Sequence, residues 1–219
     1  DSRPGKSLLL HLPMIPLDGA LFSSLRDLMQ QERRHAALVA REERALLASK
    51  LSPEDYLARA LSTKKRKELR RQYARLCEEG SVTVERRHDD HDLDHWIDTF
   101  LEIEASGWKG NAGSALSCDA GTERIFRQAL AGAAPRGRLE RLSLCLDNKP
   151  IAMLASFLTP PGAYSFKTAF DENYARFSPG VLLQRENLAM LDRPDIAWTD
   201  SCASAEHPMI DHFWRQRRI

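Results

Sequence analysis

The alternation of apolar and polar positions over residues 139–170 predicts three neighbouring β-strands. LERLSLCL, IAMLASFL and AYSFKTAF are short apolar runs, and turn signals separate them at Asp147-Asn148 and at Pro160-Pro161-Gly162. Strands joined by connections of a few residues pair antiparallel. The third strand leads into FSPGVLLQRENLAML, in which Ser178-Pro179-Gly180 begins a helix, and DIAWTD then reads as a fourth short strand.

Upstream of these strands, helical periodicity predominates. Ser52 and Ser62 have the character of N-caps, and a helix from Ser62 or Thr63 to Gly80 precedes the strand SVTVERR. DLDHWIDTFLEIEASGW is amphipathic with helical spacing, and TERIFRQALAGA follows the glycine-rich loop WKGNAGSALS. This order predicts an α+β fold of three layers with a mainly antiparallel twisted sheet flanked by helices. The expected core contains Trp96, Phe100, Leu144, Leu146, Ile151, Leu154, Phe157, Phe166 and Leu182.

The first 50 residues read as strand, helix and strand. The two strands are predicted in SLLLHLPMI and HAALVARE, and Asp18 is placed as the cap of the helix between them. A unit of this size cannot bury a core of its own, so we expect it to pack on the rest of the chain or on a further segment.

Composition changes this picture little. The 219 residues are 42% hydrophobic and 29% charged with a net charge of +1, so bulk charge favours neither nucleic acid nor a membrane surface. No apolar run approaches the roughly 20 residues that span a bilayer. The four cysteines are widely spaced without a CxxC pair, which is typical of reduced thiols, and we expect a cytoplasmic protein.

Ser178-Pro179-Gly180 is the first candidate for chemistry. A helix start beside a sheet edge presents backbone N–H groups and the positive end of the helix dipole, which suits an anion such as a pyrophosphate. An ordinary loop-to-helix transition explains the same residues. Neither a Walker loop nor a GxGxxG fingerprint is present.

Lys167 is the second candidate, because it interrupts the apolar strand AYSFKTAF. Strand alternation predicts that it lies opposite Phe166, on the face of Ser165 and Ala169. It is either a solvated lysine or a cation that stabilises a developing oxyanion.

Each of two charged clusters has a possible functional explanation and a simpler structural one. The His88–His95 segment holds metal-type residues, but a hydrated acidic turn explains it as well. The helix body Lys64–Arg75 holds seven basic residues and one acid, Glu68. That helix could meet RNA or a phosphate-rich ligand, or it could simply carry a solvated face.

Taken together, the segments resemble a known family. LSTKKRKELRRQYARLCEEG, FLEIEASGWKGNAGSAL, LDNKPIAMLASF, FKTAFDENYARFSPGVLLQREN, WTDSCA and HPMIDHFWRQRR occur in that order. They resemble the GNAT-like acetyltransferase domain described as BioF2-like, which is related to the FemAB peptidyltransferases and to the CelD proteins of cellulose gene clusters. The most specific element is the pattern formed by Lys167, Asp171, Tyr174 and Ser178–Gly180.

The resemblance implies roles for individual residues. Acyl-CoA, such as acetyl-CoA, would be the co-substrate, with no metal. The catalytic residues would be Lys167, beside the reacting carbonyl or an anionic group of the acceptor, and Asp200, which would orient or deprotonate the amine. The donor would contact Phe166, Thr168, Phe170, Ser178, Pro179, Gly180 and Val181. The acceptor would contact Trp108, Lys109, Asp171 and Tyr174.

The chain departs from the family pattern in two places. ARFSPG stands where GNAT enzymes usually carry a Q/R-x-x-G-x-G/A loop, and the chain ends at Ile219 although the family fold normally continues into further strands. Proteins of this group often hold two such halves, and the resemblance implies that residues 1–50 are the tail of a preceding GNAT-like half. Residues 51–219 would form a GNAT-like domain without its last strands.

Three functions remain open on this basis. The first is N-acyl transfer from acyl-CoA to an amine of a small metabolite or of a cell-envelope or polysaccharide precursor. The second is Fem-like peptidyl transfer from aminoacyl-tRNA, with the basic helix on the tRNA. The third is a non-catalytic GNAT-like module in polysaccharide biosynthesis or export.

Overall fold

The computed structural model describes residues 9–205, 207–211 and 213–219. Its order is helix α1 (Ala20–Gln31), strand β1 (Arg44–Leu47), helices α2 (Pro53–Ala60) and α3 (Thr63–Glu79), β2 (Val82–Arg87), α4 (Leu93–Ser106), α5 (Trp108–Asn111), α6 (Ala120–Ala133), β3 (Leu139–Leu146), β4 (Lys149–Thr159), β5 (Gly162–Phe170), α7 (Pro179–Asn187), β6 (Trp198–Asp200) and β7 (Gln216–Arg218). Short 3₁₀ turns lie at Leu116–Cys118, Ala134–Arg136, Glu172–Phe177 and Leu188–Asp192. None of the described helices is long and apolar enough to cross a bilayer.

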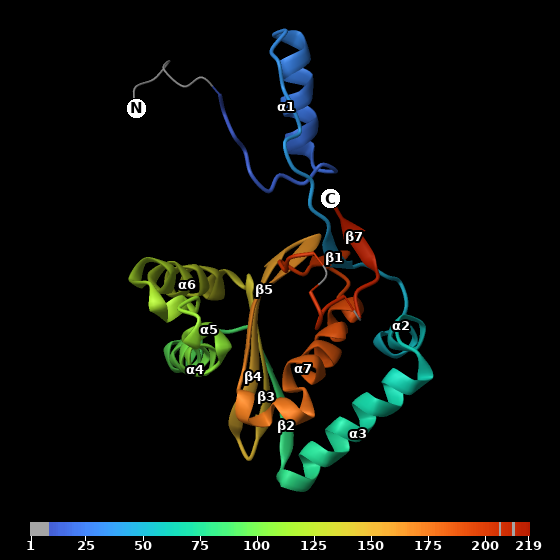
Figure 1. Cartoon of the computed structure of the whole chain (residues 1–219), viewed down its shortest axis with the longest axis vertical. Helices are drawn as coiled ribbons and strands as arrows, with labels where there is room; N and C mark the ends of the chain where they lie inside the picture. Colours follow the sequence, from blue (N-terminus) through green and yellow to red (C-terminus); the bar gives the residue numbers. More distant parts are fainter. Residues whose placement is uncertain (1–8, 206, 212) are drawn as a thin grey trace.

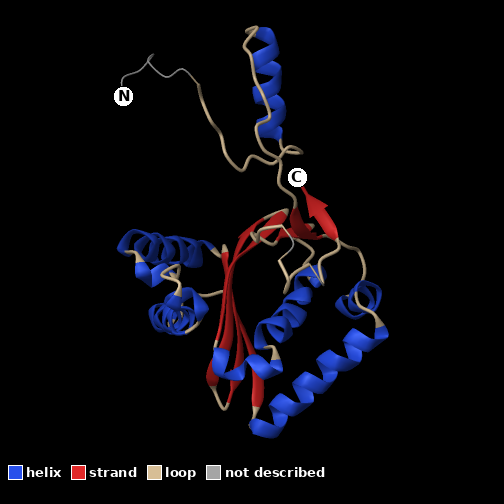
Figure 2. Ribbon diagram, viewed as in Figure 1, coloured by secondary structure: helices blue, strands red, loops and turns tan. Residues whose placement is uncertain are grey.

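The strands form one sheet in the order β2-β3-β4-β5-β6-β1-β7. All neighbouring pairs are antiparallel except β5 and β6, which are parallel. Helices α4, α5 and α6 lie on one face, and α2, α3 and α7 lie on the other (Figures 1 and 2). The predicted three-layer α+β architecture, with a mainly antiparallel sheet, is therefore confirmed.

Each face of the sheet has its own apolar cluster. One lies between the sheet and α2, α3 and α7, and the other lies between the sheet and α4 and α6. Of the predicted core residues, Phe100, Leu144, Leu146, Ile151, Leu154 and Leu182 are buried, and Trp96, Phe157 and Phe166 are partly buried and pack against the second cluster. The predicted strands at residues 82–87 and 139–170 are present.

The first 50 residues differ from the prediction. No strand forms at residues 35–42 or within 9–15, whose large apolar side chains are mostly exposed, and residues 7 and 8 lie outside the described part. The strand of this region is β1, which pairs with β6 and β7 inside the sheet. A boundary near residue 50 would thus separate β1 from the other strands of the same sheet. That a GNAT-like half precedes this domain stays a prediction. Periodicity failed here because a strand needs partner strands, which only the fold supplies.

Candidate functional site

The parallel strands β5 and β6 separate after a short paired stretch. Their register runs only from Gly162 opposite Trp198 to Tyr164 opposite Asp200. Beyond Tyr164, no described strand pairs with β5 on this side, so residues 165–170 form an open edge of the sheet. An unpaired strand edge in the middle of a sheet is a place where an extended ligand can bind through backbone hydrogen bonds.

The open edge presents the backbone of two residues in particular. The Asp171 N–H donates to Ile151 O of β4 at 2.9 Å. In an antiparallel ladder, hydrogen-bonded pairs alternate with pairs whose polar groups face away. Ala169 therefore also faces β4, and Thr168 and Phe170 turn their N–H and C=O groups toward the gap. These are two of the three residues of this strand predicted to contact the donor.

The third, Phe166, is the extra residue of a β-bulge. Ser165 lies opposite Ser156 and Lys167 lies opposite Ala155, so Phe166 has no partner of its own in β4. Its ring packs against the ring of Phe157 on the α4 and α6 side, with 5.2 Å between the ring centroids.

The bulge changes the direction of Lys167. Directly opposed residues share a face of the sheet, and Ala155 belongs to the core cluster on the α4 and α6 side. Lys167 therefore shares the face of Phe166 and Ala169, while Ser165 faces α7 and accepts a hydrogen bond from Asn187. The prediction that Lys167 lies opposite Phe166 and beside Ser165 is wrong, because the bulge interrupts the alternation. Lys167 is half-buried, and its ammonium forms no hydrogen bond or ion pair with the described residues.

Asp200, the other predicted catalytic residue, is fully buried at the end of β6. Its Oδ1 accepts the Cys202 N–H at 2.8 Å, and Arg44 and Arg218 approach its two oxygens at 3.7 Å each. The carboxylate is thus already engaged by its own chain. Burial first, and the charge of Asp200 second, raise the pKa of the neighbouring Cys202 thiol to about 11, while Arg44 and Lys167 lower it.

The helix α7 starts beside this gap with fewer free donors than predicted. Ser178 has a left-handed backbone, with φ of 52°, and its N–H donates to Ala175 O. Pro179 has no N–H, and the Val181 N–H donates to Ser178 O. Of these four residues, only Gly180 keeps an N–H without an acceptor in the described chain. The anion site expected over Ser178–Val181 therefore depends on one backbone donor and the helix dipole.

Gly180 also lies in a crowded place. A methyl group added there would be 2.7 Å from Met209 Sδ and 3.3 Å from Phe170 Cδ1. The segment of residues 207–211, which we call the cover segment, thus packs against the start of α7. The Ser178 hydroxyl accepts a hydrogen bond from Gln72 of α3, so the basic helix lies beside the same helix start.

The predicted acceptor residues Trp108 and Lys109 border a small pocket next to the open edge, which Glu104, Thr168 and Glu172 also line. Lys109 Nζ lies 2.8 Å from Glu104 Oε1 and 3.3 Å from Thr168 O. The Trp108 N–H donates to Glu172 Oε1 at 2.8 Å, while the residue as a whole is 59% exposed. This loop is therefore fixed against β5 from the same side that Lys167 faces.

Asp171 and Tyr174 have structural contacts. Asp171 Oδ1 accepts the Asn173 N–H and caps the turn Glu172–Phe177, and Tyr174 packs against the core cluster under α7. These contacts explain both residues without a substrate, and their predicted role in substrate binding stays a prediction.

Sequence reasoning missed two residues near the gap. Glu104 is 4% exposed, and its Oε2 accepts the Leu116 N–H while its Oε1 contacts Lys109. A signal for it existed, because it falls on the apolar face of a helix that also carries Ile97, Phe100 and Leu101. The other is His207 of the cover segment, which no local pattern distinguishes.

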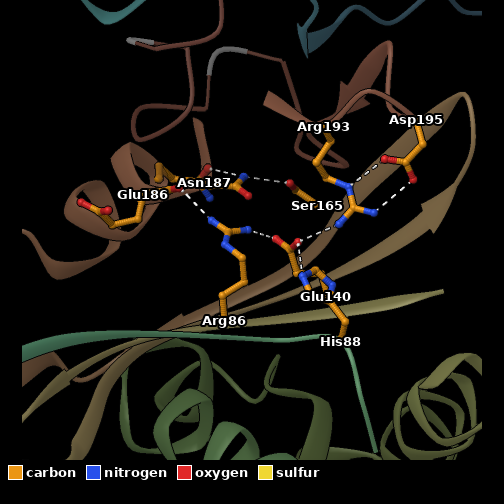
Figure 3. Close-up of polar contacts among 9 residues, drawn as sticks. Arg86, His88, Glu140, Ser165, Glu186, Asn187, Arg193 and Asp195 are labelled. Atoms are coloured by element: carbon orange, nitrogen blue, oxygen red, sulfur yellow. Dashed lines mark hydrogen bonds and ion pairs between the residues drawn. The ribbon is translucent and has the colours of Figure 1, made fainter. Parts of the chain in front are cut away.

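A second polar network lies under the other end of α7 (Figure 3). Glu140 of β3 is 1% exposed and forms an ion pair with Arg86, and His88 and Arg193 approach its Oε2 at 3.6 Å each. Arg86 also donates to Glu186 O in the last turn of α7, where a cation complements the helix dipole. We call this the Glu140 network; it fixes the C-terminal end of α7 to β2 and β3.

The two charged clusters of the sequence do not join the gap. Buried Arg141 donates to Asp89 and to the backbone of His91, so it holds the acidic turn in place. Among the described residues, no group of three or more His, Cys, Asp or Glu side chains is placed to hold a metal ion. The basic residues of α3 are mostly exposed, and Arg71 pairs with Glu68.

Residues 63–207 match the family model described as "Acetyltransferase (GNAT) domain". The chain therefore belongs to this GNAT family of acyltransferase enzymes, as its sequence motifs indicated. None of the curated proteins matches the chain.

Solved structures show the same fold at low identity. FemX is 11% identical with a TM-score of 0.61, over 89% of this chain and 62% of FemX. A conserved protein of unknown function from Bacteroides thetaiotaomicron is 12% identical with a TM-score of 0.56, over 92% of this chain and 74% of its own length. This chain thus spans about three fifths of the length of FemX, and the likeness supports the fold alone.

Proposed function

We propose that this protein is an N-acyltransferase that moves an acyl group from acyl-CoA to an amine of a small metabolite or of a cell-envelope or polysaccharide precursor. GNAT enzymes use acyl-CoA, and the observation that carries the proposal here is the open edge of β5. The amides of a pantetheine arm can pair with the backbone of Thr168 and Phe170, as an added strand would. The Gly180 N–H and the positive end of α7 then lie near its phosphates.

In this proposal, the acceptor amine approaches β5 from the side of α4 and α5, and the phosphates of the donor lie on the side of α7. Lys167, Trp108 and Lys109 all lie toward the α4 and α5 side of β5, and Glu172, whose Oε1 accepts the Trp108 N–H, lines the same pocket. The amine attacks the thioester carbonyl directly, and Lys167 stabilises the charge that develops on the carbonyl oxygen. Asp200 holds the segment after β6 in place beside β1 and β7, because its oxygens already contact Cys202, Arg44 and Arg218.

Direct attack is favoured over a covalent cysteine intermediate. The thiolate is the nucleophilic form of cysteine, and the Cys202 thiol beside the gap has a pKa raised to about 11. Near neutral pH this thiol stays protonated, so it is a poor acyl carrier.

A second candidate function uses aminoacyl-tRNA as the donor, as the FemAB resemblance implies. The observation in its favour is the exposed basic face of α3, which contacts the start of α7 through Gln72. Phosphate contacts of this kind produce binding that weakens steeply with salt.

Calorimetric titration separates these functions. We expect CoA to bind with one site per chain and with little dependence on the α3 charges. Replacing Lys64, Lys67 and Arg70 together by Gln serves as the matched test of α3. Binding of aminoacyl-tRNA alone, abolished by that triple change, would support the second function, and binding of neither donor would indicate a non-catalytic module.

A further inference from the structure

The cover segment places a histidine between the two halves of the candidate site. Its Met209 packs on Gly180 at the start of α7, and the charge of Lys109 acts on His207 from the loop on the other side of β5. Lys109 in turn contacts Thr168 O on the open edge. His207 therefore lies where a donor bound along β5 and an acceptor beside Trp108 would meet.

One nitrogen of the His207 imidazole has no hydrogen-bond partner among the described residues. Its Nδ1 is enclosed by protein and forms no hydrogen bond with the described residues. A buried side-chain nitrogen normally has a partner, and one without a partner requires an explanation, such as a catalytic role. The backbone of His207 is well held, because its carbonyl accepts the N–H groups of Ile210 and Asp211.

We propose that His207 is the general base of the reaction and that its Nε2 accepts a proton from the attacking amine, because Nδ1 is enclosed by protein. The nitrogen of the acceptor forms a bond with the carbonyl carbon of the thioester, and the carbon–sulfur bond breaks. The attacking nitrogen is that of the neutral amine, and one of its protons passes to the imidazole. The leaving sulfur takes up one proton, from the imidazolium or from water that the imidazolium has protonated, and departs as the free thiol of CoA. This inference rests on the proposed acyl transfer and assigns its proton acceptor to His207 in place of Asp200, whose oxygens already contact Cys202, Arg44 and Arg218.

The electrostatic surroundings suit that role. Burial, the largest cause, lowers the pKa of His207 below its ordinary value of 6.5, and the charge of Lys109 lowers it further. Asp211, on the same segment, acts in the opposite direction and itself lies 3.5 Å from Arg217. The neutral, proton-accepting form thus predominates at pH 7. Protonation of the imidazole should therefore lower the rate only below pH 6.5, in addition to the fall that follows from protonation of the acceptor amine itself.

The test compares His207→Gln with His95→Gln, an exposed histidine of α4 that serves as the control. Release of CoA thiol from acetyl-CoA is followed with ethanolamine and with hydroxylamine, over a range of pH. We expect His207→Gln to lower kcat with ethanolamine by about 10²-fold or more and to remove the part of the acid limb that lies below pH 6.5, while the fall caused by protonation of ethanolamine remains in both proteins. The loss with hydroxylamine should be smaller, because that amine is weakly basic and gives up its proton more easily.

Calorimetry with CoA distinguishes the possible failures. Unchanged CoA affinity in His207→Gln, together with the loss of that part of the acid limb, supports the base. An unchanged pH profile, an equal loss in His95→Gln, or a loss of CoA binding in His207→Gln would overturn it. If the wild-type protein binds no CoA, or releases no thiol with either amine, the proposed function fails and this inference fails with it.

Discussion

The gap beside β5 and the Glu140 network both contain buried charged side chains, but they are organised differently. In the Glu140 network, cations from β2 and from the segment after α7 surround one carboxylate, and the contacts link β2, β3 and α7. In the gap, the ammonium of Lys167 and the N–H of Gly180 have no partner among the described residues. Buried polar groups usually stabilise a fold only when they are paired. The comparison indicates that the first region serves stability and the second is available for ligands.

The largest effect is expected in the Glu140 network. Glu140→Ala leaves Arg86 and Arg193 without their buried partner, and breaking such a pair costs about 3–5 kcal/mol. We expect a loss of about 3 kcal/mol in the free energy of unfolding, near the lower limit of that range. The reason is that Arg86 and Arg193 keep 25% and 27% of their side-chain surface in water. Chemical denaturation measures the loss.

Glu85→Ala, which removes an exposed carboxylate of β2, is the matched control. The assignment of the Glu140 network to stability is contradicted if the two variants lose the same free energy of unfolding. It is also contradicted if Glu140→Ala is as stable as the wild type.

Lys167→Met tests the other region. Removing one oxyanion donor typically lowers kcat by about 10²–10³-fold, or roughly 2.7–4 kcal/mol. Because this ammonium has no hydrogen bond or ion pair with the described residues, we expect the melting temperature and the affinity for CoA to change little. Steady-state kinetics with acetyl-CoA, together with a thermal melt, measure both. Turnover equal to the wild type would make Lys167 a solvated strand residue and would leave stabilisation to backbone groups.

The smallest expected effect is at the start of α7. A side chain at position 180 meets Met209, so a single Gly180→Val change would disturb packing as well as ligand access. Gly180→Ala in a Met209→Ala background avoids that contact, and Met209→Ala alone is the control. We expect the affinity for CoA to fall about tenfold, or 1.4 kcal/mol, with similar stability of the two variants. Equal CoA affinity in both would move the phosphate site away from Gly180.

Local patterns in the sequence predicted most of the fold. The apolar runs of residues 139–170 and the turn residues between them specified three antiparallel strands, because side-chain alternation and turn chemistry act over a few residues. The Ser-Pro-Gly element specified the start of α7 for the same reason. The strand predicted at residues 35–42 was wrong, since β1 depends on pairing with β6 and β7, which lie more than 150 residues away in the chain.

The sequence by itself thus determined the fold class, the family, and the strand β5 with its adjacent helix. Only the tertiary structure decided which groups in that region are free. The bulge at Phe166 turns Lys167 toward the α4 side, the contact of Met209 with Gly180 crowds the helix start, and His207 comes from a segment about 40 residues after β5. Each of these depends on register or on contacts between distant segments. Local spacing contains no information about either, and so the candidate proton acceptor becomes visible only in the folded chain.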